Sequence, residues 1–102
     1  MKQRLTVLGS TGSIGTSTLD VVRRHPDQFE VFALSAATQV DALLAQCQAF
    51  TPRYAVMASA AHAAQLAEKL KQNNLKTEVL QAPDALETIA SHAEVDTVMG
   101  AI

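Results

Sequence analysis

The most informative stretch of this chain is Leu5-Thr6-Val7-Leu8-Gly9-Ser10-Thr11-Gly12-Ser13-Ile14-Gly15, which holds three of its four glycines. An apolar run typical of a buried strand leads into the glycines, and a helical pattern follows them. Glycines at this spacing let the backbone turn sharply, let an anion approach without meeting a Cβ atom, and let the helix pack close to the strand. The N-terminus of that helix offers unpaired N–H groups to the anion. The stretch therefore predicts a phosphate-binding loop, with a plain tight turn as the alternative.

Short apolar runs alternate with amphipathic helical patterns over the rest of the chain. We expect strands at Arg4–Leu8, Val31–Ser35, Arg53–Met57, Thr77–Leu80 and Asp96–Ile102. Residues at helical spacing lie between them and mark one face of each expected helix: Ile14, Thr18, Val21 and Val22; Val40, Leu43, Leu44 and Cys47; Ala63, Leu66, Ala67 and Leu70; and Leu86, Ile89 and Ala90. The fourth helix is expected to open at Pro83-Asp84. Five strands and four helices in βαβαβαβαβ order predict an α/β fold, a Rossmann-type doubly wound parallel sheet with helices on both faces.

Composition narrows the class of partner. With 102 residues the chain is expected to form one domain, and its net charge of −2, its four aromatic residues and the lack of a basic cluster beyond Arg23-Arg24 argue against nucleic acid or an anionic membrane. No segment has the apolar length of a membrane span, and no signal-peptide core follows Met1, so we expect a cytoplasmic protein. The single cysteine, Cys47, excludes an internal disulfide and lies on an apolar helix face, so it is expected in the core. Met57 and Met99 are likewise expected to pack in strands.

The loop after the second strand bears on the choice of nucleotide. Ligands of such sheets lie at the carboxyl ends of the strands, and NAD enzymes usually place an acid there to hold the ribose hydroxyls. This chain has Ser35-Ala36-Ala37-Thr38-Gln39, with no acid before Asp41. The loop therefore disfavours NAD, and Thr38 and Gln39 are neutral hydrogen-bond donors for a 2′-phosphate. Thr38 with Asp41 also matches an N-cap pair that opens the second helix, so capping remains an alternative.

Three segments resemble one family, the 1-deoxy-D-xylulose 5-phosphate reductoisomerases. They are Leu8-Gly9-Ser10-Thr11-Gly12-Ser13-Ile14-Gly15 with Ser17-Thr18-Leu19 and Val21-Val22; Gln46-Cys47 through Phe50 to Pro52-Arg53-Tyr54-Ala55-Val56; and Val95-Asp96 with Val98-Met99 and Ala101-Ile102. The resemblance covers the whole chain in register. It implies that residues 1–102 are the NADPH-binding domain of an NADP-dependent oxidoreductase and isomerase of non-mevalonate isoprenoid biosynthesis.

The resemblance also implies which residues bind the cofactor. Thr11, Gly12, Ser13 and Ile14 are expected to contact the NADPH pyrophosphate and the nearby ribose. Among these four, Ser13 has helix capping as an alternative role, Ile14 is expected to bind through its backbone N–H with its side chain in the core, and Gly12 is expected to admit the phosphate at a positive φ. Ala37, Thr38 and Gln39 stand where many family members carry Gly, Lys or Arg, and Asn. The missing cation implies a weaker preference for NADPH over NADH.

The catalytic half of such an enzyme is expected outside this chain. The apolar ending Val98–Ile102 indicates a fragment, and no catalytic or metal-binding residues are assigned within it. His25, His62 and His92 lack metal-ligand spacing. The resemblance implies that the complete enzyme is a homodimer that binds Mg²⁺ or Mn²⁺ and converts 1-deoxy-D-xylulose 5-phosphate to 2-C-methyl-D-erythritol 4-phosphate, whereas this chain alone is inactive. The alternatives are the dinucleotide-binding domain of another Rossmann oxidoreductase and a non-enzymatic nucleotide-sensing module.

Overall fold

Strands and helices alternate along the chain, as expected from the sequence. The computed structural model describes residues 3–81 and 84–100, with their side chains except that of Ile14. The elements are β1 (Gln3–Leu8), α1 (Ser13–Arg24), β2 (Phe29–Ala36), α2 (Val40–Phe50), β3 (Tyr54–Met57), α3 (Ala60–Gln72), β4 (Glu78–Gln81), α4 (Asp84–Ser91) and β5 (Thr97–Gly100). Each expected strand is present with small shifts at its ends. The expected continuation of β5 over Ala101-Ile102, and Pro83 before α4, lie outside the described residues.

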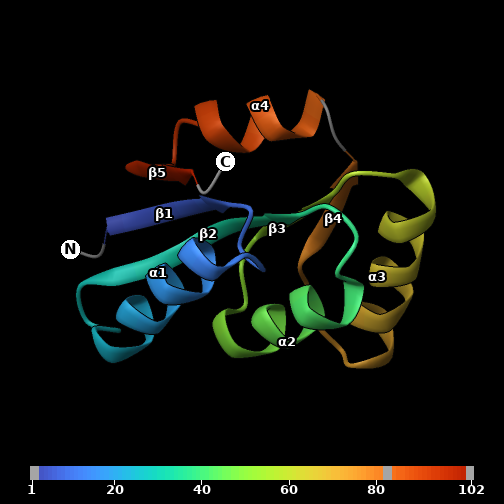
Figure 1. Cartoon of the computed structure of the whole chain (residues 1–102), viewed down its shortest axis with the longest axis horizontal. Coiled ribbons are helices and arrows are strands. Elements are labelled where there is room, and N and C mark those ends of the chain that lie inside the picture. Colours follow the sequence, from blue (N-terminus) through green and yellow to red (C-terminus); the bar gives the residue numbers. More distant parts are fainter. Residues whose placement is uncertain (1–2, 82–83, 101–102) are drawn as a thin grey trace.

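The five strands form one parallel sheet in the order β4-β3-β2-β1-β5. The chain steps in one direction from β1 to β4 and then crosses back to place β5 beside β1. Because parallel crossovers are right-handed, the three forward crossovers put α1, α2 and α3 on one face, and the return crossover puts α4 on the other (Figure 1). The predicted doubly wound sheet is confirmed. Its strand order reverses at β1, which is where ligands bind in such sheets.

Two apolar layers hold the sheet between the helices. Leu34, Leu43 and Met57 are fully buried on the side of α1 to α3, and Phe32 and Ile89 are buried on the side of α4. The central strand β2 therefore supplies apolar side chains to both layers, as a strand buried on both faces must. None of the described helices is long and apolar enough to cross a membrane.

Of the three sulfur-bearing residues expected to pack, Cys47 and Met57 are buried and Met99 is not. Cys47 is fully buried, as expected, and burial raises the pKa of its thiol to about 12. Met99 was expected to pack but is 40 % exposed. The reason is that β5 is an edge strand of the described sheet, so fewer neighbouring side chains cover it.

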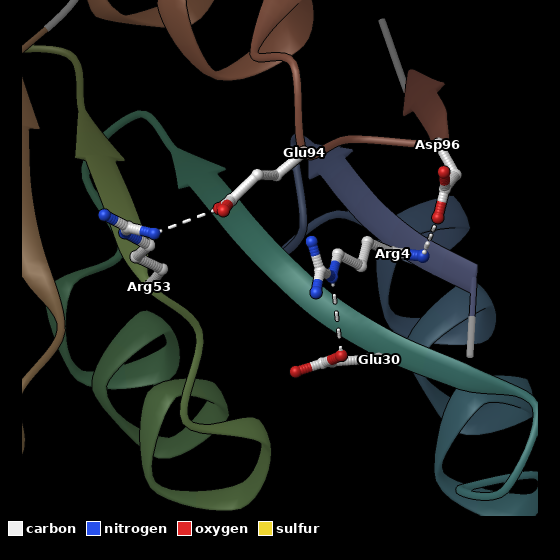
Figure 2. A network of polar contacts seen from close by, with 5 residues as sticks. All are labelled: Arg4, Glu30, Arg53, Glu94 and Asp96. Carbon is white, nitrogen blue, oxygen red and sulfur yellow. Dashed lines mark hydrogen bonds and ion pairs between the residues drawn. The ribbon is translucent and has the colours of Figure 1, made fainter. Parts of the chain in front are cut away.

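Ion pairs tie the amino-terminal ends of the strands together. The Arg4 guanidinium lies 3.8 Å from the Glu30 carboxylate and that of Arg53 lies 3.0 Å from Glu94, while the Arg4 backbone N–H donates to the Asp96 carboxylate at 2.8 Å (Figure 2). Glu94 and Asp96 lie in the turn between α4 and β5, so these contacts fasten that turn to the sheet. These contacts lie at the edge of the sheet opposite the glycine loop, residues 9–15 after β1.

Candidate functional site

The glycines of the loop after β1 have three different structural roles. Gly9 has a φ of 69°, and its carbonyl oxygen accepts a 3.0 Å hydrogen bond from the Gly12 N–H, which closes the turn. A Cβ atom at Gly15 would overlap the Gly9 carbonyl oxygen and lie 2.6 Å from the Ser10 Cα. Gly9 is therefore required for the turn and Gly15 for the close approach of α1.

Gly12 is not held in a conformation that only glycine adopts. Its φ of −77° and ψ of 171° are extended values open to any residue, so the expected positive φ at Gly12 is wrong, and it belongs to Gly9 instead. A Cβ atom at Gly12 would lie 3.4 Å from the Gly9 carbonyl oxygen, an ordinary contact. The fold tolerates a side chain here. Since Gly12 is exposed at the mouth of the loop, the space that its missing side chain leaves is available to a ligand.

The N-terminus of α1 opens onto this loop without a side-chain cap. Gly12 is the N-cap residue and has no side chain to offer, and α1 starts at Ser13. The alternative capping role of Ser13 is therefore wrong, because Ser13 is already the first helical residue. The first N–H groups of a helix have no partner within it, and the helix dipole makes this end positive. The backbone N–H groups of Ser13 and Ile14 belong to this first turn and are therefore candidate anion donors, whereas the placement of the Ile14 side chain lies outside the described structure.

The loop is anchored by residues that the sequence analysis did not assign. Ser10, which is fully buried, donates its backbone N–H to the Ser35 carbonyl oxygen at 2.8 Å, and the Gly9 N–H donates to the Ser35 Oγ at 3.0 Å. From α2, Gln46 donates its Nε2 to the Ser10 carbonyl oxygen at 2.8 Å and accepts the Ser10 hydroxyl at 2.7 Å. The sequence signals only that Gln46 faces inward, because it is a polar residue three positions after Leu43 and next to Cys47, both buried on α2; it does not identify Ser10 as the partner.

The loop after β2 presents Ala37, Thr38 and Gln39, all exposed. The N-cap of α2 is Gln39, the helix starts at Val40, and the Thr38 carbonyl oxygen accepts the Val40 N–H at 2.9 Å. The alternative N-cap pair of Thr38 with Asp41 is therefore wrong, since the helix begins one residue later than that pair requires. Asp41 instead pairs with Lys69 of α3 at 3.3 Å. The Thr38 side chain is left exposed beside the site.

Sheet topology brings the two loops to one edge. Because β1 and β2 are adjacent and parallel, the loops at 9–12 and 37–39 both follow carboxyl ends at the same edge of the sheet. The structure therefore brings together the two sets of residues expected to bind the cofactor, whereas the residues that follow β5 lie outside the described part of the chain. Anion donors at α1 and neutral hydrogen-bond donors one strand away suit a dinucleotide with an additional phosphate. Among the described residues no three His, Cys, Asp or Glu side chains are grouped to hold a metal ion.

Comparisons with known proteins point in the same direction. Residues 5–102 match the family model described as 1-deoxy-D-xylulose 5-phosphate reductoisomerase. Proteins of that name from Tolumonas auensis and Aromatoleum aromaticum are 57% and 54% identical over 100 residues, which cover 98% of this chain and 25% of each relative. The chain thus spans about a quarter of the length of the curated relatives it matches.

Solved structures resemble the fold as well. A DOX-P reductoisomerase in complex with NADPH, fosmidomycin and magnesium superposes with a TM-score of 0.93 at 41% identity, over 98% of this chain and 24% of that one. The enzyme from Zymomonas mobilis in complex with NADPH superposes with a TM-score of 0.84 at 34% identity, over 92% of this chain and 24% of that one.

Proposed function

Because this chain belongs to the 1-deoxy-D-xylulose 5-phosphate reductoisomerase family, we propose that it is the NADPH-binding domain of such an enzyme. The observation that carries the proposal is the uncapped N-terminus of α1 behind Gly12, beside an exposed loop without an acid at 37–39. The family match disfavours both alternatives, another Rossmann oxidoreductase and a nucleotide-sensing module.

The pyrophosphate is assigned to the N-terminus of α1. Its negative charge would be stabilised by the helix dipole and by the outward N–H groups of Ser13 and Ile14. The Gly12 N–H is already bonded to the Gly9 carbonyl oxygen, so Gly12 contributes space rather than a donor. Thr11, half-buried in the turn, offers its hydroxyl and backbone. This division of roles fits a phosphate group that approaches the backbone closely.

The ribose 2′-phosphate is assigned to the loop at 37–39. Thr38 and Gln39 would contribute neutral donors, and Ala37 leaves room for the phosphate. Asp41, the first acid after this loop, is paired with Lys69, which reduces its repulsion of a phosphate. Neutral donors bind a dianion less strongly than a charged partner does. The expected result is a preference for NADPH over NADH that is smaller than a lysine or arginine in this loop would give.

The remaining activity belongs to the complete protein. NADPH supplies a hydride when bound, and Mg²⁺ or Mn²⁺ would polarise the oxygens of the sugar phosphate in the conversion of 1-deoxy-D-xylulose 5-phosphate to 2-C-methyl-D-erythritol 4-phosphate. We assign the metal and substrate residues to the part of the relatives that this chain does not span. The homodimer and the cytoplasmic location expected from the sequence stay predictions.

Calorimetry of the purified chain tests the proposal directly. We expect saturable binding of one NADPH per chain and weaker binding of NADH at the same ionic strength. An absence of heat with NADPH, from a chain whose circular dichroism spectrum is that of a folded α/β protein, would refute it.

A further inference from the structure

Gln46 joins the glycine loop to a helix that lies far from it in sequence. Both ends of its side-chain amide are used on Ser10: the Nε2 donates to the carbonyl oxygen at 2.8 Å, and the Oε1 accepts the hydroxyl at 2.7 Å. Ser10 is fully buried, and Gln46 is half-buried. The Ser10 hydroxyl also lies 3.2 Å from the Ser35 carbonyl oxygen, but the shorter contact is the one to Gln46. A two-point contact of this kind fixes orientation as well as distance, because the Gln46 amide cannot rotate without losing a bond.

Ser10 is also the anchor for the strand that precedes the loop at 37–39. Its backbone N–H donates to the carbonyl oxygen of Ser35, which lies next to the end of β2. Ser35 and Gln46 therefore stand before and after the loop at 37–39, and both are bonded to Ser10. Ser10 is thus bonded to both elements that flank the exposed loop, β2 before it and α2 after it.

We propose that Gln46 is a positioning residue for cofactor selection: it sets the distance between the pyrophosphate donors of α1 and the 2′-phosphate donors at Thr38 and Gln39. The inference rests on the proposed function. Within NADPH the pyrophosphate and the 2′-phosphate are attached to the same ribose, so their separation varies little. A protein gains the full benefit of both contacts only when its two sets of donors are held at the matching separation.

The consequence is specific to NADPH, the cofactor that carries the 2′-phosphate. NADH engages the α1 N-terminus but has no 2′-phosphate, so it loses little when the two loops shift relative to each other. NADPH must satisfy both loops together. Loss of Gln46 therefore lowers the affinity for NADPH more than the affinity for NADH.

The test compares Gln46→Met with a matched control on the same helix, Gln48→Met. Gln48 is exposed and donates to the side chain of Asn73, the C-cap residue of α3, at 3.2 Å, away from the glycine loop. Dissociation constants for NADPH and NADH are measured by calorimetry for both variants and for the unsubstituted chain, together with the midpoint of thermal unfolding. We expect Gln46→Met to weaken NADPH about tenfold and NADH about threefold or less, so that their ratio falls. Gln48→Met is expected to leave the ratio unchanged.

Equal losses for the two cofactors in Gln46→Met would overturn the inference, as would unchanged affinities for both. If Gln46→Met does not fold, Gln46→Glu gives the same readout, since it keeps the acceptor for the Ser10 hydroxyl and places a carboxylate oxygen against the Ser10 carbonyl. A folded, unsubstituted chain that binds no NADPH would refute the proposed function itself, and the inference with it.

Discussion

A valine at Gly12 should separate folding from cofactor binding. The backbone there is extended, with φ −77° and ψ 171°, and a Cβ atom would meet the Gly9 carbonyl oxygen at 3.4 Å. Neither the backbone angles nor the Cβ contact imposes strain, so the expected cost to stability is that of a poorer N-cap residue, about 1 kcal/mol. The branched side chain would, however, fill the space in front of the α1 N-terminus. Loss of the pyrophosphate contacts is expected to weaken NADPH about a hundredfold or more.

Gly15 offers the matched contrast within the same loop. The Cβ atom of Gly15→Ala would lie 2.6 Å from the Ser10 Cα and 2.8 Å from the Ser10 carbonyl carbon, both of which are backbone atoms. The loop and α1 must then move apart, at a cost of about 3 kcal/mol or more. One methyl group at Gly15 should therefore destabilise the domain more than the larger side chain at Gly12.

Thermal unfolding followed by circular dichroism measures the effect of each substitution on stability, and calorimetry measures its effect on NADPH affinity. Gly12→Val should unfold close to the temperature of the unsubstituted chain and bind NADPH about a hundredfold more weakly or worse, whereas Gly15→Ala should unfold well below that temperature. Unchanged NADPH affinity in Gly12→Val would remove the α1 N-terminus from the site. A lower unfolding temperature for Gly12→Val than for Gly15→Ala would show that the roles of the two glycines are reversed.

Three further outcomes are expected. Thr38→Lys should raise the preference for NADPH over NADH about tenfold, because a charge-assisted contact replaces a neutral one, and an unchanged ratio of dissociation constants would exclude Thr38 from the 2′-phosphate site. The isolated chain should not oxidise NADPH in the presence of 1-deoxy-D-xylulose 5-phosphate and Mg²⁺. Oxidation is followed by the absorbance of NADPH at about 340 nm, and a steady loss of that absorbance would contradict the assignment of the catalytic residues to the rest of the protein. Burial raises the pKa of Cys47 from 9.0 to about 12, so the stability that the protonated thiol contributes should be complete below about pH 9 and be lost as the pH rises toward 12. Urea titrations should therefore show a smaller loss of unfolding free energy over that pH range for Cys47→Ala than for the unsubstituted chain, and identical losses would contradict this linkage.

Local patterns in the chain were enough to predict every strand and helix that the structure describes. Apolar spacing marks each element, and four helices between five strands leave a parallel sheet as the arrangement with permitted crossovers. The glycine loop, the exposed positions at 37–39 and the burial of Cys47 were equally accessible, because each depends on a few consecutive residues. The resemblance to the reductoisomerase family is confirmed by the match over residues 5–102.

Contacts between residues far apart in the sequence could not be predicted from the sequence and are seen only in the tertiary structure. The bonds between Ser10 and Gln46 span 36 positions, and nothing within either segment names the other as its partner. The positive φ lies at Gly9 rather than Gly12 because the turn closes through the Gly9 carbonyl oxygen, and α2 starts after Gln39 rather than after Thr38. Met99 remained exposed because the strand order places β5 at an edge. Periodicity along a chain reports which face of an element is apolar, whereas strand order, turn closure and cross-chain hydrogen bonds depend on which elements become neighbours in space.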